Sequence, residues 1–318
     1  MENQSKRFLD FEKPLYDLET KIDALRRSGS GSEEVQRLQK RLEQLEQDIY
    51  GNLSPWEQVQ LARHPMRPTM KRYLDLICDE FIELHGDRRF GDDAAVIGGL
   101  GRIGDRRLVV IGHEKGGSTK EKLDRNFGMA SPEGFRKALR ILKMAEKFAL
   151  PVLSFIDTPG AYPGVGAEER GQPQAIAENL EELFTIRAPI VVVVIGEGGS
   201  GGALALAIGD RILMLEHAIY SVISPEGCAA ILWKSREKAP EAAAALKLTA
   251  QDCYDLGVID YIIAEESGAS HRNPESTARS IRDRVLHEFD VLEQVDPDEL
   301  IERRERKFSS MGSFQSED

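Results

Sequence analysis

The sequence has 318 residues, of which 41% are hydrophobic, and its formal net charge is −12. The length and the hydrophobic content are typical of a globular protein with a large core and roughly two domains. The acidic balance argues against bulk binding to nucleic acid or to an anionic membrane, because both need a basic surface. The three cysteines form no CxxC pair, so no metal site is expected, and no signal peptide or membrane-spanning run is evident, which indicates a cytoplasmic protein.

Two series of apolar residues open the chain, one from Leu15 to Leu25 and one from Val35 to Ile49. Their spacing of three and four residues places each series on one side of a helix. The Ser/Gly segment from Ser28 to Ser32 breaks the pattern between them. The sequence therefore predicts an antiparallel helical hairpin, an arm with a structural role within residues 1–65.

The segment after the arm predicts a change from helix to strand. A helix is expected over Met70 to Leu84, followed by strands over Ala94 to Arg102 and Arg107 to Gly112 that are joined at a Gly-Asp turn. The next helix is expected to begin at Ser131, which is followed by proline and an acidic residue. The mixed-charge stretch from His113 to Arg125 is interpreted as a solvated face.

Strands and helices then alternate, which predicts an α/β body with a mostly parallel, buried sheet. The continuous apolar run from Ile190 to Ile195 is typical of a strand covered on both faces. Residues 276–318 are expected to form a charged helical tail.

The segment from Gly196 to Gly202 contains five glycines in seven residues. It is predicted to be a loop that follows the buried strand and opens a short helix over Ala203 to Ile208. Glycine lets backbone N–H groups approach a ligand closely, and a helix N-terminus adds partial positive charge. Such a segment suits an anion, or an oxygen that becomes anionic during a reaction.

One interpretation of this segment is dinucleotide binding. Gly196, Gly198 and Gly201 satisfy the GxGxxG pattern, and Glu216 lies about 20 residues further on, where a ribose-binding acid is expected. The helix after the glycines is short for a dinucleotide crossover, which argues against this interpretation.

Two other interpretations remain open. The pattern GxSxG centred on Ser200 suggests a serine hydrolase, with His217 or His271 as the base. Alternatively, backbone N–H groups of Gly201–Ala203 form an oxyanion hole that needs no catalytic side chain.

A second glycine-rich loop is predicted from Thr158 to Gly171. It leaves the C-terminal end of a buried strand, where open α/β sheets usually bind ligands. Its single aromatic residue, Tyr162, suits a flat ring. The preceding Asp157–Gly160 has the DxxG form of GTPases, but a P-loop lysine and an NKxD motif are missing from the sequence, so this interpretation is rejected.

Long segments of the sequence resemble the signatures of the acetyl-CoA carboxylase carboxyltransferase alpha-subunit family. The resemblance extends from Phe8 to near the end of the sequence. Its strongest matches are Phe155–Gly171, Val194–Leu204 and Tyr220–Ser235, with shorter matches at Asn126–Met129 and His271–Pro274.

This resemblance implies a crotonase-like (ClpP/crotonase) ββα superhelix, an α/β fold, with the helical hairpin as an N-terminal arm. It implies a carboxyltransferase domain over residues 66–275, between the arm and the tail. It also implies a beta-subunit partner that carries zinc, an α2β2 assembly, a biotin carboxyl carrier protein and a biotin carboxylase.

The implied reaction transfers the carboxyl group of carboxybiotin, presented by the carrier protein, to acetyl-CoA and forms malonyl-CoA, the first committed step of fatty acid synthesis. The resemblance implies that the oxyanion hole for the biotin ureido oxygen consists of the N–H groups of Gly201, Gly202 and Ala203. The residues expected to contact substrate are Gly198, Gly199, Ser200, Gly160, Ala161, Tyr162, Pro163, Gly164 and Val165.

Overall fold

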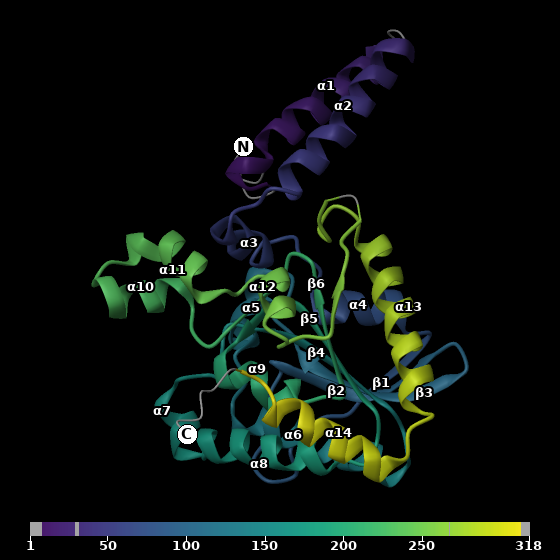
Figure 1. Ribbon diagram of the computed structural model, residues 1–318, viewed down its shortest axis with the longest axis vertical. Coiled ribbons are helices and arrows are strands. Elements are labelled where there is room, and N and C mark those ends of the chain that lie inside the picture. Colours follow the sequence, from purple (N-terminus) through teal and green to yellow (C-terminus); the bar gives the residue numbers. More distant parts are fainter. Residues whose placement is uncertain (1–7, 29–31, 267, 313–318) are drawn as a thin grey trace, which may run out of the picture.

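The computed structural model describes residues 8–28, 32–266 and 268–312. A helical arm at the N-terminus stands on an α/β body, and the last two helices run along the side and base of that body (Figure 1). No helix in these ranges combines the length and the apolar character needed to cross a membrane.

Eight strands within the described residues form one sheet. Its order is β1-β2-β3-β4-β5-β6-β8, and β7 pairs with the end of β5. The first three strands are antiparallel to one another and all other pairs are parallel, which confirms the predicted mostly parallel sheet. The strands are β1 (Glu80–Glu83), β2 (Val96–Ile103), β3 (Arg106–His113), β4 (Val152–Thr158), β5 (Ile190–Gly199), β6 (Arg211–Leu215), β7 (Ile219–Ser221) and β8 (Tyr261–Ile263).

The helices pack on both sides of the sheet and at its ends. Before the sheet lie η1 (Asp10–Glu12), α1 (Lys13–Ser28), α2 (Ser32–Tyr50), α3 (Pro55–Ala62) and α4 (Met70–Ile77). Within and after the sheet lie α5 (Thr119–Asp124), η2 (Asn126–Gly128), α6 (Pro132–Lys147), α7 (Val165–Glu169), α8 (Gln172–Thr185), α9 (Ser200–Ala207), α10 (Pro225–Trp233), η3 (Arg236–Lys238), α11 (Ala239–Leu246), α12 (Ala250–Asp255), α13 (Pro274–Leu292) and α14 (Pro297–Ser309).

The arm is the predicted helical hairpin, with α1 and α2 packed along each other. The residues that connect the two helices, 29–31, lie outside the described part of the chain. At the base of the arm, the buried carboxylate of Glu12 accepts hydrogen bonds from the hydroxyl of Tyr50 at 2.7 Å and from the N–H of Leu9 at 2.7 Å. It also lies 2.9 Å from Nε2 of His271, which belongs to the body. The arm is therefore fastened to the body by a buried polar cluster.

The helix predicted over Met70 to Leu84 is wrong in its second half. Helix α4 ends at Ile77, and β1 follows with Phe81 paired to Gly101 of β2. Apolar residues at 81 and 84 fit a helical period as well as a strand, and pairing with β2 decides between them.

The core explains why the central strands form where they do. Every residue of β4 is buried, and so are Ile190–Ile195 of β5. Helix α6 packs on β2 and β3, and α9 packs on β4 and β5. Ser131 is the N-cap of α6, as predicted, and Pro132 is the first residue of the helix.

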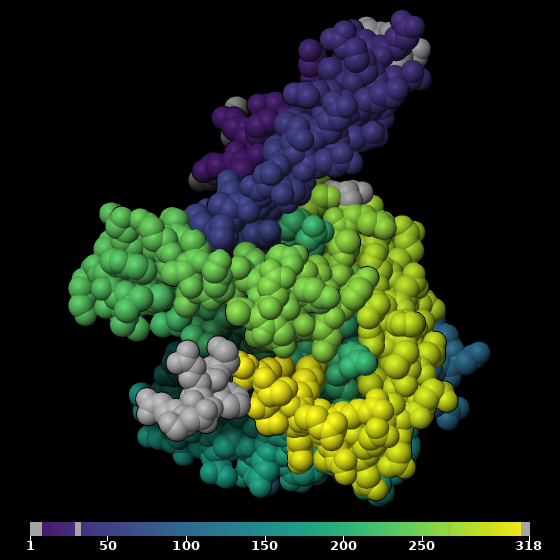
Figure 2. Space-filling model, viewed as in Figure 1, coloured from purple at the N-terminus to yellow at the C-terminus, as the bar shows by residue number. Residues whose placement is uncertain are grey.

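The C-terminal helices are more than a charged tail. Ile281, Phe289 and Leu300 are buried and belong to the same core as the sheet. Figure 2 shows this segment in yellow, lying directly against the body. The polar residues of these helices explain why their sequence is interpreted as a charged helical tail, although one face of each helix is apolar.

Candidate active site

The glycine-rich segment is not a loop, as the sequence predicts, but the end of a strand and the start of a helix. Strand β5 continues to Gly199, pairing with Thr158 on one side and with Tyr220 of β7 on the other. Helix α9 begins at Ser200, three residues earlier than expected. The strand pairing on both sides explains the difference, because it gives the backbone of Gly198 and Gly199 ladder partners that a loop would lack.

The glycines are needed because neighbouring atoms touch their Cα positions. A Cβ on Gly196 would lie 2.3 Å from Oδ1 of Asp157, and one on Gly198 would lie 2.5 Å from the ring of Tyr220. A Cβ on Gly199 would lie 2.3 Å from the carbonyl group of Pro159. Close approach, rather than loop flexibility, therefore accounts for the glycine content.

The first turn of α9 contains the predicted oxyanion donors. Ser200, at the start of the turn, has a φ of +53°, a left-handed conformation that is uncommon for a residue other than glycine. The first N–H groups of a helix have no partner within it. Since α9 begins at Ser200, the amides left without a helical partner are those of Ser200, Gly201 and Gly202, whereas the amide of Ala203 is the first to bond back to Gly199.

The second predicted segment, Thr158 to Gly171, contains a short helix that the sequence interpretation missed, α7. The turn before it is fixed by hydrogen bonds. The N–H of Tyr162 donates to the carbonyl of Ala130 at 2.9 Å, and Nε2 of Gln172 donates to the carbonyls of Ala130 and Tyr162 at 2.8 and 3.0 Å. Gln172 is a buried positioning residue that no local pattern indicated.

The two predicted segments meet. The Cα of Gly202 packs on the peptide between Gly160 and Ala161, where a Cβ would lie 2.4 Å from the nitrogen of Ala161. The remaining predicted residues follow on the same turn: the Cα of Gly164 packs on the ring of Tyr162, and Pro163 and Val165 are exposed. The structure therefore brings together backbone groups that are about 40 residues apart in the sequence.

A cavity of about 390 Å³ adjoins the first turn of α9. Ser200, Gly201 and Leu204 line one side of it, and Tyr220, Leu256 and Phe308 contribute to the others. The first turn of α9 thus faces an open and largely apolar space.

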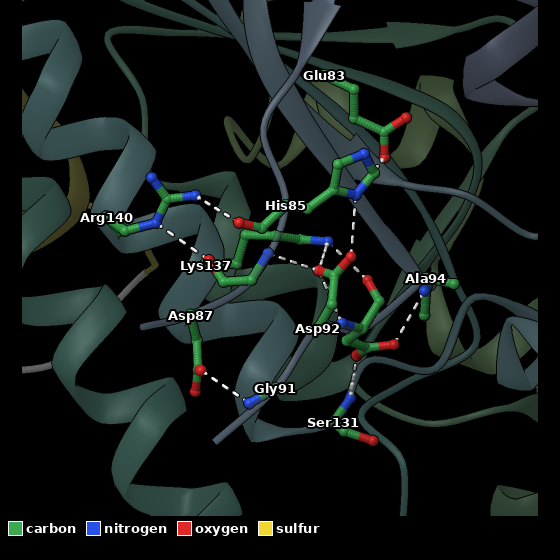
Figure 3. Close-up of polar contacts among 12 residues, drawn as sticks. Glu83, His85, Asp87, Gly91, Asp92, Ala94, Ser131, Lys137 and Arg140 are labelled. Carbon is green, nitrogen blue, oxygen red and sulfur yellow. Dashed lines mark hydrogen bonds and ion pairs between the residues drawn. The ribbon is translucent and has the colours of Figure 1, made fainter. Parts of the chain in front are cut away.

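The segment between β1 and β2 forms a polar cluster with Ser131 and with Lys137 of α6 (Figure 3). Nζ of Lys137 donates to the carboxylate of Asp92 at 2.5 Å and to the carbonyl of Asp93 at 2.8 Å. The carboxylate of Asp93 in turn accepts the N–H of Ser131 at 2.7 Å. Ser131 follows Ala130, whose carbonyl accepts the N–H of Tyr162, so this polar cluster is connected to the Tyr162 turn through two adjacent residues.

The interpretation of residues His113 to Arg125 as a solvated face is wrong at its start. His113 is fully buried beside the backbone of Gly202 and Phe155, and burial lowers its pKa to about 3, so the ring is neutral. Lys115 lies between two carboxylates, with Nζ 2.7 Å from Oδ1 of Asp157 and 2.7 Å from Oε1 of Glu197. Burial alone would lower the pKa of Lys115, but these carboxylates outweigh it and raise that pKa.

The serine hydrolase interpretation is wrong, because neither candidate histidine is positioned as a base for Ser200. Ser200 is exposed, while the buried ring of His217 lies 3.1 Å from Oε1 of Gln58 and His271 is paired with Glu12. Neither histidine has a hydrogen bond to Ser200 among the described residues. A nucleophile without a base in reach is not activated.

The dinucleotide interpretation also fails on geometry. Its fingerprint needs glycines in a turn between strand and helix, but Gly196 and Gly198 both lie within β5, and Gly198 pairs with Thr158 and Tyr220. The carboxylate of Glu216 accepts the backbone N–H of Glu265 at 3.0 Å, so it has a structural role at the end of the sheet.

Solved structures with the same fold are carboxyltransferases and a related decarboxylase. A transcarboxylase 12S chain with hydrolysed methylmalonyl-coenzyme A bound superimposes with a TM-score of 0.59 at 18% identity, over 75% of this chain and 45% of that one. A Pseudomonas malonate decarboxylase hetero-tetramer in complex with coenzyme A gives a TM-score of 0.56 at 16% identity, over 70% of this chain and 90% of that one. The chain therefore has the crotonase fold of these enzymes, as the resemblance implied.

Closer relatives define the family. Residues 8–312 match the family described as "Acetyl co-enzyme A carboxylase carboxyltransferase-like". The acetyl-coenzyme A carboxylase carboxyl transferase subunit alpha of Halorhodospira halophila is 52% identical over 98% of this chain and 99% of its own length, and that of Xanthomonas campestris pv. campestris is 53% identical over 97% and 98%. The chain belongs to the family of acetyl-CoA carboxylase carboxyltransferase alpha subunits.

Proposed function

We propose that this chain, together with a beta subunit, transfers a carboxyl group from carboxybiotin to acetyl-CoA and so forms malonyl-CoA for fatty acid synthesis. Family membership over nearly the whole chain supports the reaction. The observation that supports the site is the contact between Gly202 and the Gly160–Ala161 peptide, which joins two backbone turns. The turn that contains Gly202 also borders a cavity, through Ser200 and Gly201.

The chain's contribution to the reaction is electrostatic. As the carboxyl group leaves biotin, negative charge develops on the ureido oxygen, and preorganised N–H donors stabilise such an oxygen by about 3–4 kcal/mol each. The amides of Gly201 and Gly202 donate to that oxygen. Ala203 begins the helical hydrogen bonds and so holds the turn in place. The positive end of α9 adds to the effect.

The other predicted residues shape the place where the biotin ring lies. One side of the biotin site consists of the backbone of Gly198, Gly199 and Ser200. The opposite side consists of the turn over Gly160–Val165. Tyr162 offers its ring as a flat contact surface.

Family membership supports the remaining assignments, which we propose as well. The beta subunit carries the zinc site and completes an α2β2 assembly, the biotin carboxyl carrier protein presents carboxybiotin, and a biotin carboxylase loads it. We also propose the division into an arm (1–65), a carboxyltransferase domain (66–275) and a tail (276–318), and a cytoplasmic location.

The experiment is co-expression with a candidate beta subunit, followed by an assay of malonyl-CoA decarboxylation that depends on biocytin. The test variant is Gly202→Val, whose side chain collides with the Gly160–Ala161 peptide. We expect carboxyl transfer to fall by about a hundredfold or more, while far-UV circular dichroism and co-elution with the beta subunit are retained.

The matched control is Gly91→Val, because a Cβ at Gly91 meets no atom within 4 Å. Its turnover should equal that of the unaltered chain. Normal turnover in Gly202→Val would remove this turn from the mechanism. Absence of biocytin-dependent turnover in the unaltered complex would overturn the proposed reaction itself.

A further inference from the structure

Strands β4 and β5 lose their regular pairing just before they enter the proposed site. Ile156 pairs with Val194 and Thr158 pairs with Gly198, so one residue of β4 faces three of β5 across a bulge. The backbone groups within a bulge have no regular ladder partners. Something else has to hold the two strands together at this point.

Side chains bond to the backbone of β5 within the bulge, and one of them, Asp157, belongs to β4. The carboxylate of Asp157 accepts the N–H of Glu197 at 2.9 Å, and Nε of the buried Arg67 donates to the carbonyl of Ile195 at 2.7 Å. The Cα of Gly196, between them, fits closely against the carboxylate of Asp157. Between β4 and β5, the bulge is therefore held by side-chain contacts, while β7 pairs with Glu197 on the other side of β5.

Lys115 joins the two sides of the bulge. Its Nζ lies 2.7 Å from Asp157 on β4 and 2.7 Å from Glu197 on β5, and only 16% of its side chain is exposed. Glu197 is also held from the far side by Nε of Arg63 at 2.6 Å, and Arg63 extends to Glu226 on α10 at 2.5 Å. These charges raise the pKa of Lys115 and hold that of Glu197 at about 2, so the charged forms persist near neutral pH.

We infer that Lys115 is a positioning residue for carboxyl transfer: it fixes Asp157 and Glu197, and through them the spacing between the Gly160–Ala161 turn and the first turn of α9. Asp157 lies three residues before Gly160 of the first turn, and Glu197 lies three residues before Ser200 of the second. The inference rests on the proposed function, because it concerns the placement of the same amides.

A shift of these amides weakens the stabilisation of the transition state more than it weakens the binding of substrate. Oxyanion donors act on an oxygen whose charge appears during the reaction, and misplacement by about 1 Å costs about a hundredfold in rate. Loss of the Lys115 ammonium should therefore lower kcat and leave KM nearly unchanged. A residue that serves stability alone would change the amount of folded protein, but not kcat per folded site.

The test uses the complete complex with the beta subunit and compares Lys115→Ala with Lys147→Ala, an exposed lysine on α6. Both are assayed by malonyl-CoA decarboxylation with biocytin, per assembled site as measured by size-exclusion chromatography. We expect Lys115→Ala to lose about a hundredfold in kcat with KM for malonyl-CoA changed less than about threefold. Lys147→Ala should match the unaltered complex.

Chemical rescue separates positioning from packing. Lys115→Ala leaves a gap between two carboxylates, and ethylammonium can place a cation there. We expect added ethylammonium to recover about tenfold of the lost kcat, whereas tetramethylammonium at the same ionic strength, which has no N–H donors, recovers none. Equal effects of the two cations, or unchanged kcat in Lys115→Ala, would overturn the inference.

Arg63→Met keeps the test decisive if Lys115→Ala does not assemble. Arg63 lies nearer the surface, with 30% of its side chain exposed, and supports the same Glu197 from the other side. An assembled Arg63→Met complex should lose about tenfold in kcat. Full activity in that complex would overturn the inference, while the activity of the unaltered complex reports separately on the proposed function.

Discussion

Arg304 on α14 and Asp210, just before β6, form a buried bidentate ion pair. Nε and Nη2 of Arg304 lie 3.0 and 2.8 Å from the two carboxylate oxygens of Asp210. Nη1 of the same arginine donates to the carbonyls of Leu183 and Ile186 at 2.6 and 3.0 Å. The last helix is thereby fastened to the end of α8 and to the residue that precedes β6.

We expect Arg304→Met to lower the free energy of unfolding by about 3–5 kcal/mol. The physical reason is that the methionine leaves the Asp210 carboxylate buried without its cation, and breaking one side of a buried pair costs this much. Urea unfolding followed by circular dichroism measures the change. Arg303→Met is the matched control, because the pair of Arg303 with Glu299 is exposed and should contribute less than about 1 kcal/mol. Equal losses in the two variants would contradict the role of the buried pair.

Local pattern in the sequence predicted the elements whose apolar residues are continuous or regularly spaced. The arm, the run over Ile190–Ile195 and the helix after Ser131 are of this kind. It failed for β1, because only pairing with β2 distinguishes that strand from a continued helix. It predicted helices in the tail but not their packing on the core, because the many charges of α13 and α14 conceal an apolar face on each.

The site could be predicted only in part for a similar reason. The two glycine-rich segments can be recognised in the sequence by their composition. The structure shows that the turns they form are in contact. The charges that hold them are not visible, because Arg63 and Glu197 are separated by 134 positions and no spacing rule connects them. Glycine content also indicated a loop where close approach within a strand is the cause.

Ser200, at the centre of the GxSxG pattern, allows a direct test of the rejected hydrolase interpretation. We expect Ser200→Ala to keep carboxyl transfer within about tenfold of the unaltered complex, because Ser200 contributes its backbone and neither histidine reaches its hydroxyl. The biocytin-dependent assay measures this. A loss above about a hundredfold, the scale expected when a catalytic nucleophile is removed, would revive the hydrolase interpretation.

The Glu12 cluster at the base of the arm makes the stability of the protein depend on pH. Burial alone would raise the pKa of Glu12, but hydrogen bonding and charge interaction with His271 outweigh it and hold the pKa at about 2, below the usual 4.5. The ionised carboxylate therefore stabilises the folded state fully above about pH 4.5, and this contribution is lost as the pH falls toward about 2.

We expect Glu12→Gln to lower the free energy of unfolding by about 1–3 kcal/mol at neutral pH, because the amide weakens the bonds to Tyr50 and His271. The difference from the unaltered chain should shrink as the pH is lowered, since protonation then neutralises Glu12 in both folded and unfolded states. Urea unfolding at a series of pH values measures it, with the exposed Glu43→Gln as control. A difference that stays constant with pH would show that Glu12 acts through packing and not through its charge.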